Sequence, residues 1–238
     1  MIAGTLFQST HFKLTLWFLA IYLISEAKTG LSSLALMRQL GVSYPTAWLI
    51  QQKLMQAMAE RDALYTLSGD VQVDDAYLGG ELTGGKSGRE APRIKCRLSR
   101  RFLSVPKAIR CTSKWCRFPA LLANWANEDL SPGCVVLSDG LACFAGVTDA
   151  GCQHEVIIAG GRKLKDLPEF NWLNTVLGNL KTSLGGAYHA FDFSKYGTRY
   201  LAAFSYRFNR RFHLDTLPMR LILASATIGP RPSLAAPS

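Results

Sequence analysis

The sequence predicts an α/β protein in which a small helical region precedes a sheet with flanking helices. Three observations lead to this class. Apolar residues recur at helical spacing over residues 1–62, three short apolar runs between residues 70 and 158 have the composition of strands, and helical spacing returns from about residue 174.

The composition is that of a globular chain. Of 238 residues, 48% are hydrophobic and 18% are charged, which excludes disordered, collagen-like and coiled-coil classes. A chain of this length can bury a sizeable core without disulfides. Its six cysteines include no CxxC pair, so neither a disulfide framework nor a common zinc signature is indicated.

The first element is the apolar run Leu14–Ile24. Its 11 residues are too few to cross a bilayer, which needs about 20. The flanking residues do not fit a signal peptide, because only Lys13 precedes the run closely and no suitable cleavage site follows it. We therefore expect a buried helix, no membrane partner and a cytoplasmic protein.

The next two elements form a helix–turn–helix pattern. Residues 31–40 have helical spacing, Gly41-Val42-Ser43 makes a short turn, and Tyr44-Pro45 opens a second helix that runs to about residue 62. In a DNA-binding protein the second helix would enter a groove of the duplex. The side chains predicted to be exposed and able to contact DNA are Arg38, Gln51, Gln52 and Lys53. An ordinary helical hairpin fits the same pattern.

Strands are predicted at Val71–Leu78, Cys134–Leu137 and Glu155–Ile158, each followed by a turn or a polar stretch. Helices are predicted at about 174–184 and 194–212, and the Pro- and Ser-rich end from Gly229 is expected to fray. These elements divide the chain into a helical, DNA-binding region at 1–65, an α/β domain at 68–216 and a C-terminal tail at 217–238.

Two predicted strands each lead to an aspartate beside a glycine turn, Asp74 and Asp139. Carboxylates at strand ends can meet in space and bind Mg²⁺, which requires only one or two protein carboxylates. On a later predicted helix, Asn174 and Lys181 are seven residues apart and share one face, so an amide ligand and a phosphate-binding cation are available there. On spacing alone, the ordinary turn chemistry of an Asp before a Gly is the better explanation.

Five stretches, taken in this order and spacing, resemble the insertion-sequence transposases of the ISXO type. They are Val71–Gly80, Ser138-Asp139-Gly140, Trp172–Lys181, Tyr188-His189 and Tyr206–Arg211. The resemblance runs from about Gly4 to about Leu217, with one gap.

The resemblance implies a DDE-type transposase of a bacterial insertion sequence, with a ribonuclease-H-like mixed sheet. Asp74 matches the first acid of the family, Asp139 the second, Asn174 the third position and Lys181 the following lysine, which places the chain in an Asp-Asp-Asn-Lys branch. In this family the acids bind Mg²⁺ or Mn²⁺, water cuts the element ends, and the new 3′-hydroxyl attacks target DNA. The implied partners are double-stranded DNA and further copies of the chain.

Several further residues have two interpretations. Asp75 competes with Asp74 for the first acid, but adjacent strand residues face opposite ways and the motif favours Asp74. Arg207, Arg210 and Arg211 lie on a late helix, where they either hold phosphate or form a solvated face. The roles of His154 and His189 are open, and for His189 a structural hydrogen bond and a DNA contact fit equally well.

The chain departs from the family pattern at its start. No cysteine precedes Cys96, so the zinc ribbon with which relatives usually begin is expected to be absent. We expect part of the recognition of the element ends to be lost with it.

A second departure is the window Arg89–Arg117, which carries nine of the ten net positive charges. Relatives have apolar strands here, often reading NKVPFVAAV. Codons for that stretch (AAT AAA GTG CCG TTT GTC GCG GCG GTT), read one base later and followed by a pyrimidine, encode IKCRLSRRF, which is Ile94–Phe102. We hypothesise an out-of-frame segment over about 90–117, since so many cations do not suit a central strand. A genuine basic DNA-binding insertion is the alternative.

The sequence therefore predicts a DNA transposase that cuts and joins DNA with Mg²⁺ through Asp74, Asp139, Asn174 and Lys181. A helix–turn–helix DNA-binding protein without catalysis is a second interpretation. A decayed, inactive transposase copy is a third.

Overall fold

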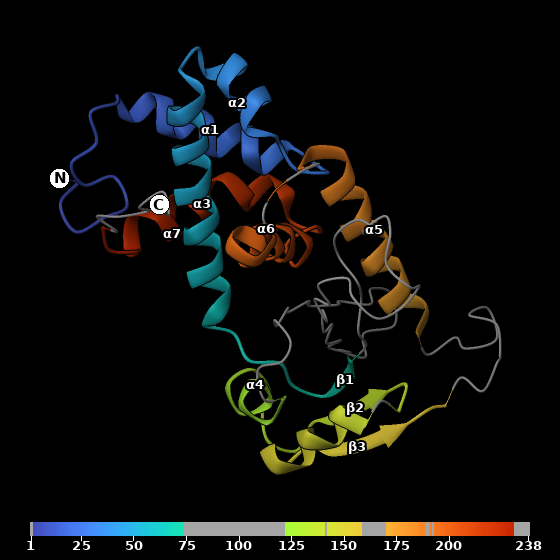
Figure 1. Ribbon diagram of the computed structural model, residues 1–238. Helices are drawn as coiled ribbons and strands as arrows, with labels where there is room; N and C mark the ends of the chain where they lie inside the picture. The colour runs from blue at the N-terminus through green and yellow to red at the C-terminus, as the bar shows by residue number, and fades with distance from the viewer. Residues whose placement is uncertain are drawn as a thin grey trace. The chain divides into compact units, whose positions relative to one another are not determined.

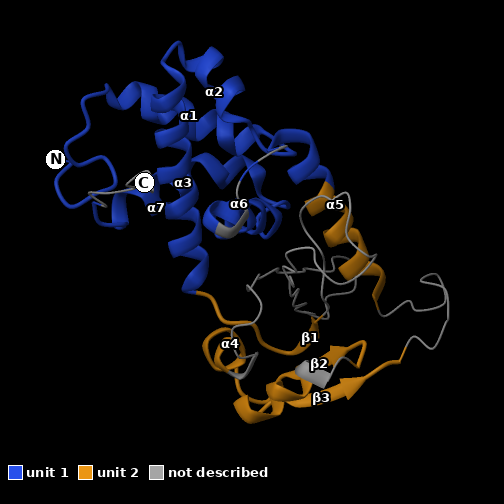
Figure 2. Cartoon of the chain, in the orientation of Figure 1, with its two compact units in different colours: residues 1–64, 182–238 blue, residues 65–181 orange. Residues whose placement is uncertain are grey.

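The computed structural model describes residues 2–73, 122–140, 142–158, 170–188, 191 and 193–230 (Figure 1). The chain forms two compact units, which Figure 2 shows in different colours. Unit 1 comprises residues 1–64 and 182–238, and unit 2 comprises residues 65–181. This division differs from the sequence-based boundaries, because residues 182–216 of the predicted α/β domain join the N-terminal helices.

The secondary-structure elements in the described residues of unit 1 are all helices, and the first three are those predicted. They are α1 (Leu14–Glu26), α2 (Ser33–Leu40) and α3 (Tyr44–Ala63). The Ser32 hydroxyl caps α2 by accepting a hydrogen bond from the Ala35 N–H at 3.1 Å. Gly41 then ends α2 in the left-handed conformation, with its N–H bonded to the Met37 carbonyl. Pro45 lies in the first turn of α3, where its missing N–H costs nothing.

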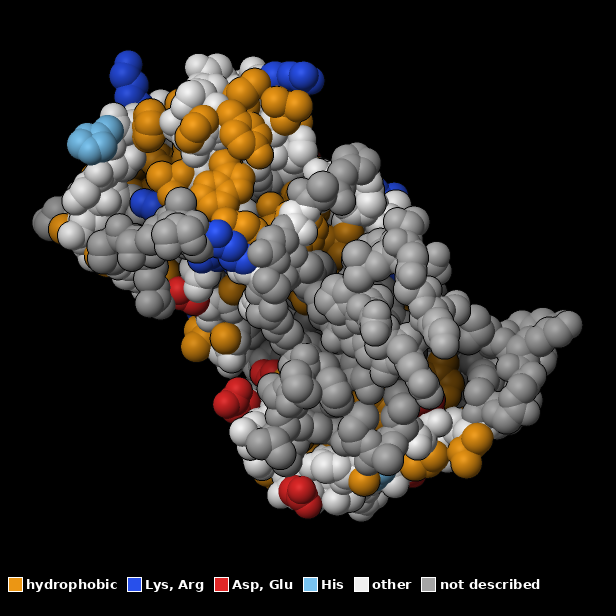
Figure 3. Space-filling model, viewed as in Figure 1, with side chains coloured by type: hydrophobic (Ala, Val, Ile, Leu, Met, Phe, Trp, Pro, Cys, Tyr) orange, Lys and Arg blue, Asp and Glu red, His pale blue; other side chains and the backbone are white. Residues whose placement is uncertain are grey.

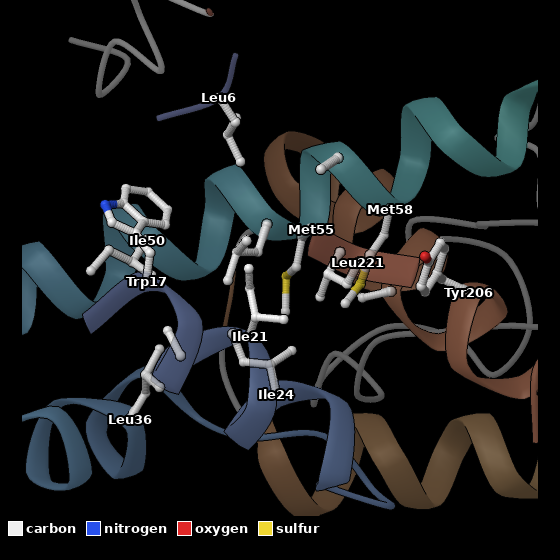
Figure 4. Packing of buried hydrophobic residues seen from close by; sticks show 14 of the residues in the cluster. Leu6, Trp17, Ile21, Ile24, Leu36, Ile50, Met55, Met58, Tyr206 and Leu221 are labelled. Atoms are coloured by element: carbon white, nitrogen blue, oxygen red, sulfur yellow. The ribbon is translucent and has the colours of Figure 1, made fainter. Parts of the chain in front are cut away.

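The second chain segment of unit 1 contributes α6 (Phe193–Phe208), the 3₁₀ turn η4 (Leu214–Thr216) and α7 (Leu217–Thr227). Helix α7 lies in the stretch that the sequence analysis treats as a tail. Its residues Leu217 and Leu221 are fully buried and belong to the same hydrophobic cluster as α1 and α3. Figure 4 shows Leu221 among Ile21, Met55 and Met58 in this cluster.

Unit 2 contains a three-stranded sheet in the order β1-β2-β3, with β1 at Asp70–Val73, β2 at Val135–Ser138 and β3 at Gln153–Val156. Both pairs of neighbouring strands are parallel. The three predicted strands are therefore present, although β3 ends two residues before its predicted limit, and residues 74–78 of the first predicted strand lie outside the described residues. A mixed sheet also needs an antiparallel strand, which would have to come from residues outside the described part of the chain. The predicted mixed sheet therefore remains a prediction.

Helix α4 (Leu122–Asp129) and the 3₁₀ helix η1 (Ala142–Ala150) pack against one another beside the sheet. Their side chains Trp125, Phe144 and Val147 are buried in one cluster with Val71 and Val136 of the sheet. Because β1 and β2 are embedded in this apolar layer, the chain segments that follow them start from well-defined positions.

Helix α5 (Asn171–Ala187) is longer than the predicted helix at both ends. The boundary between the two units falls between its residues Lys181 and Thr182. Among the described helices of the chain, none has the length and apolar character needed to cross a membrane.

Candidate active site

Asp139 is the first residue after β2, at the end of the sheet where the parallel strands leave it. Strand β2 (Val-Val-Leu-Ser) alternates half-buried and buried side chains, which holds the chain in the sheet as far as Ser138. Gly140 then turns the backbone with a φ of +89°, a conformation that favours glycine. Asp139 is half-buried in this turn.

The turn around Asp139 is held by a set of hydrogen bonds on its preceding residue, Ser138. The fully buried Ser138 hydroxyl accepts a hydrogen bond from the Gly140 N–H at 3.2 Å. The same oxygen lies 2.8 Å from His154 Nε2 on β3. The Ser138 carbonyl accepts a hydrogen bond from the Ile157 N–H at 2.9 Å. His154 thus takes part in a hydrogen bond within the sheet, while His189 lies outside the described residues.

The sequence-predicted partner acid follows the neighbouring strand. In the parallel pair of β1 and β2, Val73 is in register with Ser138. Asp139 therefore directly follows β2, just as Asp74 directly follows β1 in the sequence. Asp74 and its competitor Asp75 themselves lie outside the described residues.

Asn174 and Lys181 are together on α5, as predicted. Because a helix turns by about 100° per residue, two residues seven apart lie on one face. Leu173, Val176, Leu177 and Leu180 form the buried side of the same helix. Asn174 is half-buried at the border of that side, and Lys181 is exposed. The structure thus places an amide and an ammonium group along one stripe of α5, and places Asp139 on a different element.

The predicted ligands have the right chemistry for Mg²⁺, because carboxylate and amide oxygens are the hard donors that this ion prefers. Within the described part of the chain, no group of three or more His, Cys, Asp or Glu side chains is arranged to hold a metal ion. The predicted set includes one Asn and one acid outside the described residues, so the donor types fit while their assembly remains a prediction.

The predicted exposure of Gln51 and Gln52 on α3 is wrong. Both side chains are buried, with exposed fractions of 1% and 0%. Gln51 accepts a hydrogen bond from the Ser33 hydroxyl and donates one to the Leu31 carbonyl. Gln52 donates to the Tyr200 hydroxyl and accepts from the Arg199 guanidinium, each at 3.2 Å. Their amides are occupied inside unit 1 because α3 is covered by α2 on one side and α6 on the other.

Arg38 and Lys53 remain candidates for DNA contact. Arg38 is exposed on α2, and Lys53 is half-buried on α3 with its ammonium 5.9 Å from the centre of the Trp17 ring. The large side chains exposed near the start of α3 are apolar, namely Tyr44 and Leu49. Figure 3 shows hydrophobic side chains gathered on the visible face of unit 1, with Lys and Arg side chains around them.

The three late arginines are engaged within unit 1, and the solvated-face interpretation is corrected for Arg207 and Arg210. Arg207 is buried and donates hydrogen bonds to the Ala203 and Ala27 carbonyls. The guanidinium of Arg210 forms a 2.8 Å ion pair with Asp62 and lies 3.6 Å from the centre of the Tyr206 ring.

Arg211 stacks on the Phe208 and Phe212 rings and donates to the Phe208 carbonyl at 2.9 Å. A half-buried guanidinium held in this way is not part of a solvated helix face.

Sequence reasoning missed the cluster of Tyr188, Phe191 and Tyr200, in which the centre of the Tyr200 ring lies 4.5 Å from that of Tyr188 and 4.3 Å from that of Phe191. Burial raises the pKa of Tyr200 to about 12 and raises the pKa of Tyr188. No local signal points to this cluster, because Tyr200 lies on α6 while Tyr188 and Phe191 lie in the stretch between α5 and α6. Gly30 packs so closely on it that a Cβ there would lie 2.5 Å from the Tyr188 hydroxyl.

The model of a protein family described as the ISXO2-like transposase domain matches residues 66–209, which is more than half of the chain. No curated protein and no solved structure matches the chain.

Proposed function

Because the chain belongs to the ISXO2-like transposase family, we propose that it derives from a transposase that cleaves and joins DNA with Asp74, Asp139, Asn174 and Lys181. The observation that carries this proposal is the parallel register of β1 and β2. It pairs Val73 with Ser138, the residues directly before the two acids in the sequence. Two carboxylates that follow neighbouring parallel strands leave the sheet at the same edge.

Each residue has a separate role in this proposal. Asp74, Asp139 and Asn174 supply oxygen ligands for a divalent ion, Mg²⁺ or Mn²⁺. Such ions, when bound, activate the attacking oxygen and stabilise the leaving oxygen in phosphoryl transfer. Lys181 neutralises a phosphate oxygen, because an ammonium group donates hydrogen bonds but cannot ligate a cation.

The fold that we propose for the complete domain is ribonuclease-H-like. In the described sheet order β1-β2-β3, strands β1 and β2 are parallel neighbours. The first acid, Asp74, follows β1 in the sequence, and the second acid, Asp139, follows β2. The two further strands that the family places after the first acid fall within residues 74–121, outside the described residues.

We assign the DNA contacts of unit 1 to the region around the turn of residues 41–43. The predicted helix–turn–helix pattern is supported by an eight-residue α2, a left-handed Gly41 and a long α3. With Gln51 and Gln52 buried, Arg38 and Lys53 are the predicted contacts that remain. Cations at such positions contact phosphates and so contribute affinity more than sequence selectivity.

We further propose that the chain as it stands is catalytically inactive. The basic window at residues 89–117 lies outside the described residues, so the argument is the one from sequence. A one-base shift converts Ile94–Phe102 to a family-like apolar strand, and cations do not suit the strand that neighbours the first acid. The nucleotide sequence of the gene tests the shift directly.

The catalytic assignment is tested in a version with the reading frame restored. The assay measures Mg²⁺-dependent strand transfer of DNA that carries the ends of the flanking element, together with gel-shift binding. Asp74→Ala, Asp139→Ala and Asn174→Ala should each abolish strand transfer and leave DNA binding intact, because each removes a metal ligand and no phosphate contact. Asp149→Ala, an exposed acid on η1, is the matched control. Normal strand transfer in any of the three removes that residue from the site.

Lys181→Ala should weaken strand transfer or end binding while metal binding is kept. Loss of metal binding in this variant would contradict its assignment to phosphate. We also expect the active assembly to contain more than one copy of the chain on DNA, which light scattering of the protein–DNA complex measures.

A further inference from the structure

We propose that His154 is a positioning residue for Asp139. It acts through the hydroxyl of Ser138, which fixes the turn that carries the acid. This inference rests on the proposed function, since it concerns the metal ligand Asp139.

The geometry joins two strands at one buried oxygen. The Ser138 hydroxyl has an exposed fraction of 0%, lies 2.8 Å from His154 Nε2 and accepts the Gly140 N–H at 3.2 Å. Asp139 is the residue between the two ends of that second hydrogen bond. Any movement of the hydroxyl is therefore transmitted to the backbone on both sides of the acid.

The register of the sheet explains why His154 reaches Ser138. His154 on β3 is paired with Val136 on β2, and Ser138 lies two residues further along β2. Residues two apart on a strand point to the same face, so the two side chains form a diagonal pair that a long side chain can bridge. Sequence spacing alone does not show this contact, because 16 residues separate the two.

The hydrogen-bonding capacity of the hydroxyl fits this arrangement. A serine hydroxyl has one proton and two acceptor lone pairs. The His154 nitrogen can either accept a hydrogen bond from the Ser138 hydroxyl or donate one to its oxygen. In both cases the oxygen keeps a lone pair that can accept the Gly140 N–H. Without the imidazole, a fully buried hydroxyl would lose a partner and would be free to rotate, which weakens its bond to the Gly140 N–H.

The second anchor of Ser138 also comes from the segment of β3. Its carbonyl accepts the Ile157 N–H at 2.9 Å. Ser138 is thus held through its side chain and its main chain by the same neighbouring segment, one residue before Asp139. Partners that hold a metal ligand in this indirect way typically change metal affinity or activity by about 10- to 100-fold when removed.

The test uses the full-length, ¹⁵N-labelled protein and Mn²⁺ alone as the probe. Mn²⁺ bound near Asp139 broadens the amide signals of Asp139 and Gly140 in an NMR titration. We expect His154→Leu to raise the Mn²⁺ concentration needed for half-maximal broadening by about 10-fold. His154→Gln should restore most of the wild-type response, because its amide nitrogen or oxygen can take the place of Nε2.

Two further variants make the interpretation specific. Ser138→Ala and the double variant Ser138→Ala/His154→Leu should respond alike, since His154 acts only through the hydroxyl. Gln153→Leu, an exposed neighbour on β3, should respond like wild type. A wild-type response of His154→Leu, or a failure of His154→Gln to restore the response, would overturn the inference.

A measurement without metal separates this inference from the proposed function. Hydrogen exchange of the Gly140 amide should be about 10-fold faster in His154→Leu and close to wild type in His154→Gln, an estimate that corresponds to about 1.4 kcal/mol. If wild type shows no Mn²⁺ broadening while this exchange pattern appears, the chain as it stands does not bind metal at Asp139, and the positioning of the turn by His154 stands. An unchanged Gly140 exchange rate in His154→Leu overturns the inference whatever the metal result.

Discussion

Gly140 has a backbone conformation that other residues adopt only with strain. Its φ is +89°, and a Cβ built there would lie 2.8 Å from Val156 Cγ1. Gly133, before β2, has a similar φ of +81° but no atom within 4 Å of a built Cβ. The two glycines at the two ends of β2 therefore separate the cost of the left-handed conformation from the cost of a steric clash.

We predict that Gly133→Ala destabilises the protein by about 1–2 kcal/mol, the cost of a left-handed non-glycine residue. Gly140→Ala should cost a further ~1–3 kcal/mol, because the stiff Val156 side chain must move. Urea unfolding curves of the two variants measure the difference. Equal costs for both substitutions would show that Val156 moves freely.

The burial of Gln51 and Gln52 could not be predicted from their residue types alone. Polar side chains in a helix are normally expected on its exposed face. Here each amide both donates and accepts a hydrogen bond inside unit 1, so its burial is compensated. Which partners were available depended on α2 and α6, and no local pattern in α3 contains that information.

At the scale of elements, the ends of α3 and α6 are joined by the ion pair of Asp62 and Arg210. The two side chains are only 12% and 10% exposed, and their closest atoms are 2.8 Å apart. The Arg210 guanidinium also covers the Tyr206 ring and donates to the Tyr206 carbonyl. The pair is therefore a structural connection between two helices that are far apart in the sequence.

We predict that Asp62→Asn destabilises the protein by about 3 kcal/mol, because it leaves a largely buried guanidinium without its countercharge. Thermal unfolding of this variant and of Glu26→Gln, an exposed acid at the end of α1, provides the comparison. The control should unfold within about 0.5 kcal/mol of wild type. A wild-type stability of Asp62→Asn would return Arg210 to the list of DNA-contact candidates.

The packing of α6 on α3 should also depend on pH. Burial raises the pKa of Tyr200 to about 12, and its hydroxyl accepts a hydrogen bond from Gln52. The unfolded chain releases the phenol proton near pH 10, whereas the folded chain keeps it up to about pH 12. Over that interval the folded state binds more protons than the unfolded state, so the free energy of unfolding falls as pH rises.

We predict that Tyr200→Phe flattens this decline. The variant should be about 1 kcal/mol less stable than wild type at pH 8, because the hydrogen bond from Gln52 is lost. Above pH 10 the two curves should converge. Urea midpoints measured from pH 8 to pH 11 test this, and parallel curves for the two proteins would be the contrary result.

At the scale of the whole molecule, unit 1 is assembled from both ends of the chain. Leu221 of α7 is 0% exposed in the cluster that contains Ile21 and Met55, whereas Leu223 on the same helix is 58% exposed. The C-terminal segment is thus part of the N-terminal core. A chain that ended before α7 would leave that core open.

We predict that Leu221→Ala destabilises unit 1 by about 2–5 kcal/mol, the usual cost of a cavity at a fully buried leucine. Leu223→Ala should change stability by less than about 0.5 kcal/mol, since its side chain is already largely in water. Circular dichroism during urea unfolding compares the two variants. Similar small effects for both would mean that α7 is not docked on the core.

The sequence by itself determined the class of the chain and the kind and order of the predicted elements. Hydrophobic periodicity, Gly41, Pro45 and the Asp139-Gly140 turn are local signals, and the elements that they predict are present. The motif order also led to the transposase family, because spacing along the chain is fully contained in the sequence. Asp139, Asn174 and Lys181 could be selected in the same way.

The tertiary structure decided which side chains are buried and which residues support the site. Gln51, Gln52, Arg207 and Arg210 acquired structural roles from partners that lie up to 180 residues away. His154 acquired its role from the register of β2 and β3. Helix α7 joined the core for the same reason, since the burial of a side chain depends on long-range packing that local sequence patterns do not contain.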